Sequence, residues 1–98
     1  MIFIKKCGYL VFYVTEANGA VPLYKAKIVI SVGDIRKNAQ SKKTGMSASV
    51  EFDFSDCDQP FLCASAKVSL SGYKELILSD IKIYPNVKTV RIANLERI

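Results

Sequence analysis

An alternation of apolar and other residues, repeated along the chain, constrains the fold more than any other feature. Between residues 9 and 15 and between residues 24 and 32, every second side chain belongs to one apolar set: Leu10, Phe12, Val14, Ala26, Ile28, Ile30 and Val32. A period of two with one consistently apolar face is typical of a half-buried β-strand. Asn18-Gly19 and Pro22, between the two stretches, favour a turn. We therefore expect a strand, a turn and a second strand.

The same alternation returns in four later stretches, which are residues 46–54, 63–71, 76–84 and 87–95. Ser79 and Asp80 shift the apolar set within the third of them and predict a bulge there. In the last stretch we expect Val90 and Ile92 to point inward. No segment has the 3.6-residue apolar period of a helix. Six or seven short strands predict an all-β fold, a small Greek-key β-sandwich.

The chain is expected to be one domain over residues 1–98, because 98 residues with 50% apolar side chains can form one core. Residues 1–6 are interpreted as a lead-in and residues 96–98 as a tail. Residues 33–45 (GDIRKNAQSKKTG) are interpreted as a long polar loop, with room for a short edge strand near Ile35.

The start of the chain does not have the basic, apolar and cleavage segments of a signal peptide in their usual order. Lys5 and Lys6 follow an apolar patch instead of preceding it, and no small-residue cleavage site comes next. We therefore expect the protein to be cytoplasmic when synthesised. No stretch approaches the roughly 20 apolar residues of a membrane span.

The three cysteines, Cys7, Cys57 and Cys63, allow at most one internal disulfide. An odd, sparse set favours a reducing compartment. Cys63 lies in an alternating stretch and is predicted to be a small core residue. Whether Cys57 and Cys63 pair is left open.

Several short motifs together resemble one known family. They are Gly8-x-Leu10-x-Phe12-x-Val14, Ala17-Asn18-Gly19-Ala20-x-Pro22-Leu23, Thr44-Gly45 before a strand, and Ala66-x-Val68 before Gly72-Tyr73. This set resembles the carboxypeptidase regulatory-like modules, which have a transthyretin-like (prealbumin-like) β-sandwich. It is similar to accessory domains of clostridial spore-cortex and peptidoglycan-associated proteins. The resemblance implies a non-catalytic module, although the Asp of the family's Thr-Asp-x-x-Gly pattern before the third strand is missing here, where the chain reads Lys42-Lys43-Thr44-Gly45.

The residue types argue against most enzyme chemistry. Histidine is absent, which removes Ser-His and Cys-His nucleophilic pairs and most zinc sites. We expect no catalytic residues and no cofactor. Asp53, Asp56 and Asp58 are interpreted as turn residues, with a weak calcium site as the alternative. The net charge of +5 is spread along the chain without interleaved aromatic residues, so nucleic acid is not an expected partner.

Tyr9, Val11 and Tyr13 make the face opposite Leu10 and Phe12 unusually apolar. A small cluster under a loop is one interpretation, and a protein-binding surface is the other. We predict an interaction surface of these three residues together with the basic side chains of the polar segment, namely Arg36, Lys37, Lys42 and Lys43.

The sequence therefore predicts a non-catalytic interaction or assembly module of a bacterial multiprotein structure. A spore layer, a cell-envelope structure or a phage-tail-like particle would fit, with self-association or another protein as the partner. The alternative is an accessory domain that binds carbohydrate or peptidoglycan, with Tyr24, Tyr73 and Tyr84 as stacking platforms.

Overall fold

A computed structural model describes residues 7–16, 19–53 and 60–98. Its strands are β1 (Cys7–Glu16), β2 (Val21–Pro22), β3 (Lys27–Val32), β4 (Ile35–Gln40), β5 (Val50–Asp53), β6 (Leu62–Ser69), β7 (Leu76–Ile83) and β8 (Lys88–Asn94). No helix in these ranges is long and apolar enough to cross a membrane. The expected lead-in at residues 1–6, Asn18, Asp56, Cys57 and Asp58 lie outside the described residues.

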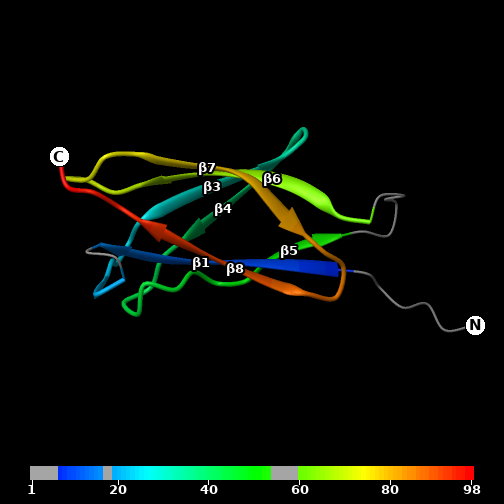
Figure 1. The fold of residues 1–98 in the computed structure, drawn as a ribbon, viewed down its shortest axis with the longest axis horizontal. Helices are drawn as coiled ribbons and strands as arrows, with labels where there is room; N and C mark the ends of the chain where they lie inside the picture. Colours follow the sequence, from blue (N-terminus) through cyan, green and yellow to red (C-terminus); the bar gives the residue numbers. More distant parts are fainter. Residues whose placement is uncertain (1–6, 17–18, 54–59) are drawn as a thin grey trace, which may run out of the picture.

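The strands form two sheets that pack face to face (Figure 1). In the first sheet, β1 is central: β8 pairs with one edge, and β5 and β2 pair with different parts of the other. In the second sheet the order is β4-β3-β6-β7. All pairings are antiparallel except that between β1 and β8, which run side by side in the same direction. The predicted all-β sandwich is confirmed.

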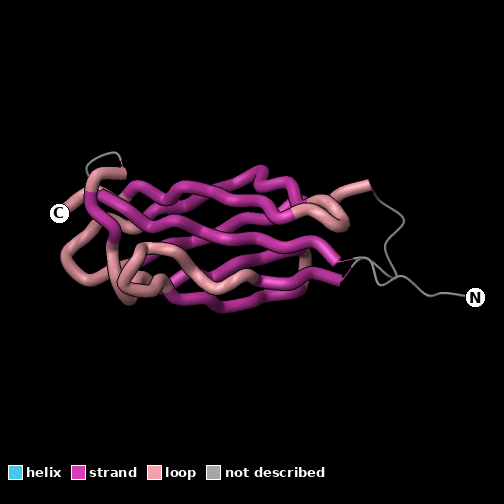
Figure 2. Tube along the Cα trace, turned by 90° about the horizontal axis from the view of Figure 1, so that it is seen from below, coloured by secondary structure: helices cyan, strands magenta, loops and turns pink. Residues whose placement is uncertain are grey.

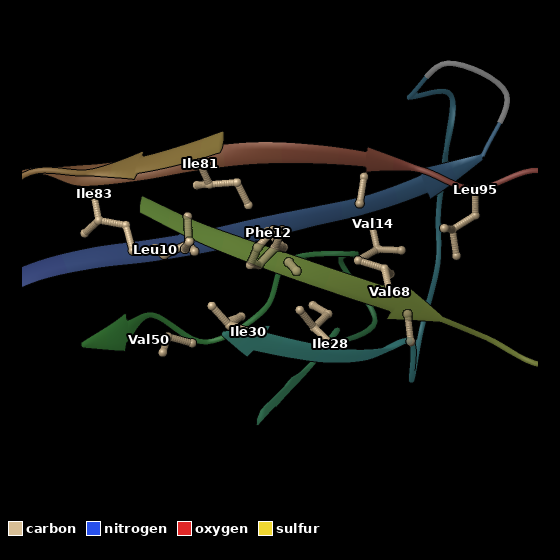
Figure 3. Packing of buried hydrophobic residues seen from close by; sticks show 14 of the residues in the cluster. Leu10, Phe12, Val14, Ile28, Ile30, Val50, Val68, Ile81, Ile83 and Leu95 are labelled. Atoms are coloured by element: carbon tan, nitrogen blue, oxygen red, sulfur yellow. The ribbon is translucent and has the colours of Figure 1, made fainter. Parts of the chain in front are cut away.

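Figure 2 shows the strands running along the length of the molecule. The core lies between the two sheets and is built from the alternating sets (Figure 3). Phe12 comes from β1, Ile28 and Ile30 from β3, and Val68 from β6, and all four are fully buried. They pack with Ile81 of β7 in one hydrophobic cluster. Because each of these strands turns one face toward the core, the period of two was a reliable signal.

The bulge predicted at Ser79 and Asp80 is confirmed. Ala64 of β6 pairs with Ile81, whereas Ala66 pairs with Leu78, so two residues of β7 stand opposite the single Ser65. Asp80 has a positive φ of 54°. The extra residue lets apolar side chains on both sides of the bulge reach the core.

The interpretation of residues 33–45 as a loop is wrong for its central part, where Ile35–Gln40 form β4, and the short edge strand allowed near Ile35 is confirmed. Gly33, with a φ of 55°, lies in the turn that joins β3 to β4. In the part of the chain that the structure describes, β4 pairs only with β3, so it is an edge strand. Its side chains are exposed or half-buried, which explains why the segment lacks an apolar alternation.

The prediction that Cys63 is a core residue is also wrong. Cys63 is exposed, and its neighbour Ala64 is buried. Its strand partner is Lys82, so both side chains lie on the outer side of the second sheet. Of the two cysteines within the described ranges, the buried one is Cys7, at the start of β1.

Residues 96–98 are tied to the body of the sandwich. The Lys74 amide donates to the Glu96 carbonyl over 2.7 Å, and the Ile98 amide donates to the Gly72 carbonyl over 3.1 Å. Between them, Arg97 forms an ion pair with Glu16 at the end of β1. The predicted tail is therefore a structural connection between β1 and the turn before β7.

Candidate functional site

The outward side of the first sheet carries a row of apolar and aromatic side chains over β1 and β8. In the parallel register, Val90 is the neighbour of Val11, and Ile92 is the neighbour of Tyr13. These side chains lie opposite the core residues Leu10 and Phe12 in the alternation of β1. We call this surface the apolar face and define it by Tyr9, Val11, Tyr13, Val90 and Ile92.

Val90 and Ile92 were predicted to point inward, and this is wrong. Val90 is 51% exposed and Ile92 is 66% exposed, whereas Ala93 and Leu95 are buried. The position that shares a register pair with the core residue Phe12 is occupied by Arg91, which is itself exposed. Because β8 pairs only with β1 among the described strands, it lies at the edge of the sheet, and a long charged side chain at this position can reach solvent. The charged residue between the two apolar ones is the signal that sequence reasoning missed.

The predicted residues Tyr9, Val11 and Tyr13 do lie together on the apolar face, but they differ in exposure. Tyr9 and Tyr13 are half-buried. Val11 is only 4% exposed, although no strand of the described residues packs over this side of the sheet. Val11 therefore adds little accessible surface, and the accessible apolar surface is supplied mainly by Val90 and Ile92.

Tyr13 is held in place from the side opposite β8. It forms an isolated antiparallel bridge with Met46. The Val14 amide donates to the Gly45 carbonyl over 2.8 Å. A Cβ atom on Gly45 would lie 2.9 Å from Cε1 of Tyr13, so the ring rests directly on this glycine. The aromatic part of the apolar face is thus positioned before any partner arrives.

Two charges of opposite sign flank the apolar face at the Tyr9 end. Tyr9 pairs with Lys88 on its β8 side and with Glu51 on its β5 side, so the three residues form one cross-strand row. Both charged residues are exposed. The Sγ of Cys7 donates to Oε1 of Glu51 over 2.9 Å, which helps to position this carboxylate. A polar border around an apolar centre is the usual organisation of a protein-binding surface.

The four basic residues predicted for the surface do not gather around the tyrosines. Arg36 pairs with Ser31 and lines a hollow on the outer side of the second sheet. The ammonium of Lys37 donates to the carbonyl of Glu51. It also lies 5.0 Å from the ring centre of Phe52. Lys42 and Lys43 border a different hollow, with Tyr24.

The tyrosines of the carbohydrate alternative are spread over both ends of the molecule. Tyr24 lies beside a surface hollow of about 570 Å³. Tyr73 is near Arg97, whose guanidinium lies 6.0 Å from its ring centre. Tyr84 packs on Phe61 with ring centres 5.8 Å apart. Since β7 separates Tyr73 from Tyr84 by about 25 Å at the usual strand rise, these two rings do not belong to one platform.

A metal site has no support in the ranges that the structure describes, where no group of three or more His, Cys, Asp or Glu side chains could hold an ion. Asp53 lies at the end of β5, opposite Cys7. The other two members of the predicted aspartate cluster are outside those ranges, so the calcium alternative stays a prediction.

Comparison with known proteins supplies no family for this chain. No protein-family model matches it, and no curated protein matches it. The apolar face and its surroundings are therefore the features of the molecule that point to a function.

Proposed function

We propose that this chain is a non-catalytic β-sandwich module that binds a protein through its apolar face. The observation that carries the proposal is the outward orientation of Val90 and Ile92 beside Val11 and Tyr13. The resemblance to modules of spore-cortex and peptidoglycan-associated proteins favours a place in a larger bacterial assembly. A spore layer, a cell-envelope structure and a phage-tail-like particle all fit.

The arrangement of β8 leaves apolar surface that a partner can bury. A single exposed apolar side chain is ordinary on a protein surface, but a contiguous group is informative. Here the chain places two β-branched apolar residues outward and a charged residue between them at the inward position. Burying the exposed parts of Val90 and Ile92 under a partner would contribute about 25 cal/mol per Å². Aromatic residues such as Tyr9 and Tyr13 often anchor such contacts.

Site-specific photo-cross-linking tests the proposal. Benzoylphenylalanine replaces Ile92 in the cells that make the protein, and Ile77 is replaced in a matched control. Ile77 is 68% exposed, nearly the same as Ile92, but it lies on the outer side of the second sheet. We expect position 92 to cross-link to a protein and position 77 to give little product. Equal yields at the two positions, or no product at position 92, would overturn the proposal.

The carbohydrate alternative makes a different prediction. A module that stacks sugar rings on Tyr24, Tyr73 or Tyr84 should co-sediment with insoluble peptidoglycan. Retention that is lost in Tyr24→Ala or Tyr84→Ala and kept in Ile92→Lys would favour this alternative. The separation of Tyr73 from Tyr84 along β7 gives it less support than the apolar face gives to protein binding.

A further inference from the structure

We infer that the partner on the apolar face is a second copy of this chain, packed face to face about a two-fold axis that runs close to β1. This inference rests on the proposed function and identifies the partner. A two-fold interface uses the same patch on both copies, so every feature on one side of the axis must meet its complement from the other side. The apolar face meets this requirement in two successive tests.

The first test is charge. Consider a two-fold axis that runs along β1 and lies between the two facing copies. Rotation about this axis places the β8 side of each face against the β5 side of the other. Lys88 and Glu51 stand on these two sides in the row of Tyr9. Lys88 of each copy therefore comes opposite Glu51 of the other, which gives two symmetric pairs of opposite charge. Such complementarity favours the correct register over other pairings.

The second test is the apolar contact in the row of Tyr13. Here Ile92 stands on the β8 side, and Met46 stands on the other side of β1. The same exchange brings Ile92 of each copy opposite Met46 of the other. An unbranched thioether side chain adapts to the shape of its partner. Tyr9, Val11 and Tyr13 lie near the axis and meet their own counterparts.

The geometry of sheet packing is compatible with this arrangement. Two sheets packed face to face lie about 10 Å apart, with their strands about 30° from parallel. The axis would then lie about 15° from the direction of β1, half of the angle between the two copies of the strand. The long side chains of Lys88 and Glu51 can span such a rotation.

A charge-exchange series measured by light scattering behind a sizing column, with reductant present, tests the inference. For the wild type we expect a mass that rises from 10.9 kDa toward twice that value over a hundredfold range of concentration. Lys88→Glu places Glu opposite Glu, and Glu51→Lys places Lys opposite Lys. Each single variant should weaken dimerisation by about tenfold or more, and the double variant should recover most of it. Lys82→Glu, on the second sheet, is the control for net charge and should dimerise like the wild type.

Three outcomes would overturn the inference: a monomer at every concentration, single variants that dimerise like the wild type, or a double variant no better than the singles. Thermal melts identify a variant that fails to fold, and Lys88→Glu provides the decisive measurement if Glu51→Lys is unstable. A monomer whose position 92 cross-links to a different protein would overturn the self-association and leave the proposed function standing. A monomer without any such cross-link would overturn both.

Discussion

Arg97 and Glu16 are 81 residues apart in the chain and form a two-bond ion pair. The Arg97 Nε donates to one carboxylate oxygen over 2.9 Å, and the second nitrogen donates to the other over 3.0 Å. The hydrogen bond from Arg97 is the main reason that the pKa of Glu16 lies below its ordinary value of 4.5. A bond with Tyr73 lowers it further, while partial burial acts in the opposite direction. The same pairing raises the pKa of Arg97.

This pair predicts a defined pH dependence of stability. Because the pKa of Glu16 is lower in the folded protein, its contribution is fully present above pH 4.5 and is lost as the pH falls through the lowered value. Arg97→Gln should be less stable than the wild type near neutral pH, and the difference should shrink in acid. Urea unfolding from about pH 7 to about pH 2.5 measures it. Lys67→Gln, which removes a pair at 3.5 Å between exposed groups, is the control and should change little. A wild-type advantage that is equal at every pH would contradict the assignment.

The buried hydroxyl of Ser41 should stabilise the fold through two hydrogen bonds. This hydroxyl accepts from the Ala26 amide over 2.9 Å and donates to the Leu23 carbonyl over 2.8 Å. Ser41→Ala leaves both backbone groups without this partner, and we expect a loss of about 1–3 kcal/mol in the free energy of unfolding. Ser65→Ala, at an exposed site on β6, should change stability by less than about 0.5 kcal/mol. Denaturant titration compares the two, and equal losses would show that the Ser41 hydroxyl is dispensable.

Replacing Gly45, which lies beside the apolar face, with a larger residue should destabilise the protein by a steric clash. The φ of Gly45 is 84°, and an added Cβ would lie 2.8 Å from the Val14 carbonyl oxygen. Gly33 also has a positive φ, of 55°, but an added Cβ there meets nothing within 4 Å. Gly33→Ala should therefore cost only the backbone strain of about 1–2 kcal/mol. Gly45→Ala should cost about 1–3 kcal/mol more, because β1 must shift to relieve the contact. Thermal melts measure the stability of both variants. Equal losses would show that the added Cβ at Gly45 is not crowded against the Val14 carbonyl.

Arg91 predicts an effect on solubility. A charged residue at an inward register position of an edge strand discourages pairing with another sheet. Arg91→Val should keep the fold but aggregate at lower protein concentration than the wild type. Arg36→Val makes the same change of charge on the edge strand β4, at an outward position. Turbidity during slow concentration compares the variants. If the two aggregate alike, net charge and not the position of Arg91 is responsible.

The thiols of Cys63 and Cys7 should react at different rates. Cys63 is exposed, so a maleimide should label it at once in the native protein. Cys7 is buried and can react only when β1 opens locally, so we expect labelling at least about tenfold slower. Peptide mapping after timed quenching separates the two sites, and labelling in denaturant supplies the control. Equal rates would show that the start of β1 is open to solvent.

The predictability of each strand from the sequence follows from its place in the sandwich. The strands β1, β3 and β6 have one face in the core along their length, so their alternation predicted them well. In contrast, β4 lies at an edge with little buried area, and its polar sequence resembles a loop. The two-residue strand β2 is too short to carry any period.

The candidate site was predictable only on the β1 side. Tyr9, Val11 and Tyr13 stood out because they lie opposite a strongly apolar set. Their neighbours Val90 and Ile92 were assigned to the core, since apolar residues normally point inward. What the sequence alone did not contain is the parallel pairing of β8 with β1, a contact between distant segments that no local pattern specifies.

That pairing gives the protein an order of assembly during its own synthesis. The ladder between β1 and β8 reaches from Tyr9 and Lys88 to Thr15 and Asn94, and the last two residues are 79 positions apart in the chain. A ribosome adds about 5–20 residues each second, so β1 waits roughly 4–16 s for this neighbour. During that time its edge and its tyrosines face the surrounding cell without their strand partner. The nascent chain therefore passes through an interval in which this edge can associate with other chains. The interval ends when β8 emerges from the ribosome, and chaperone binding would protect the chain most during that time.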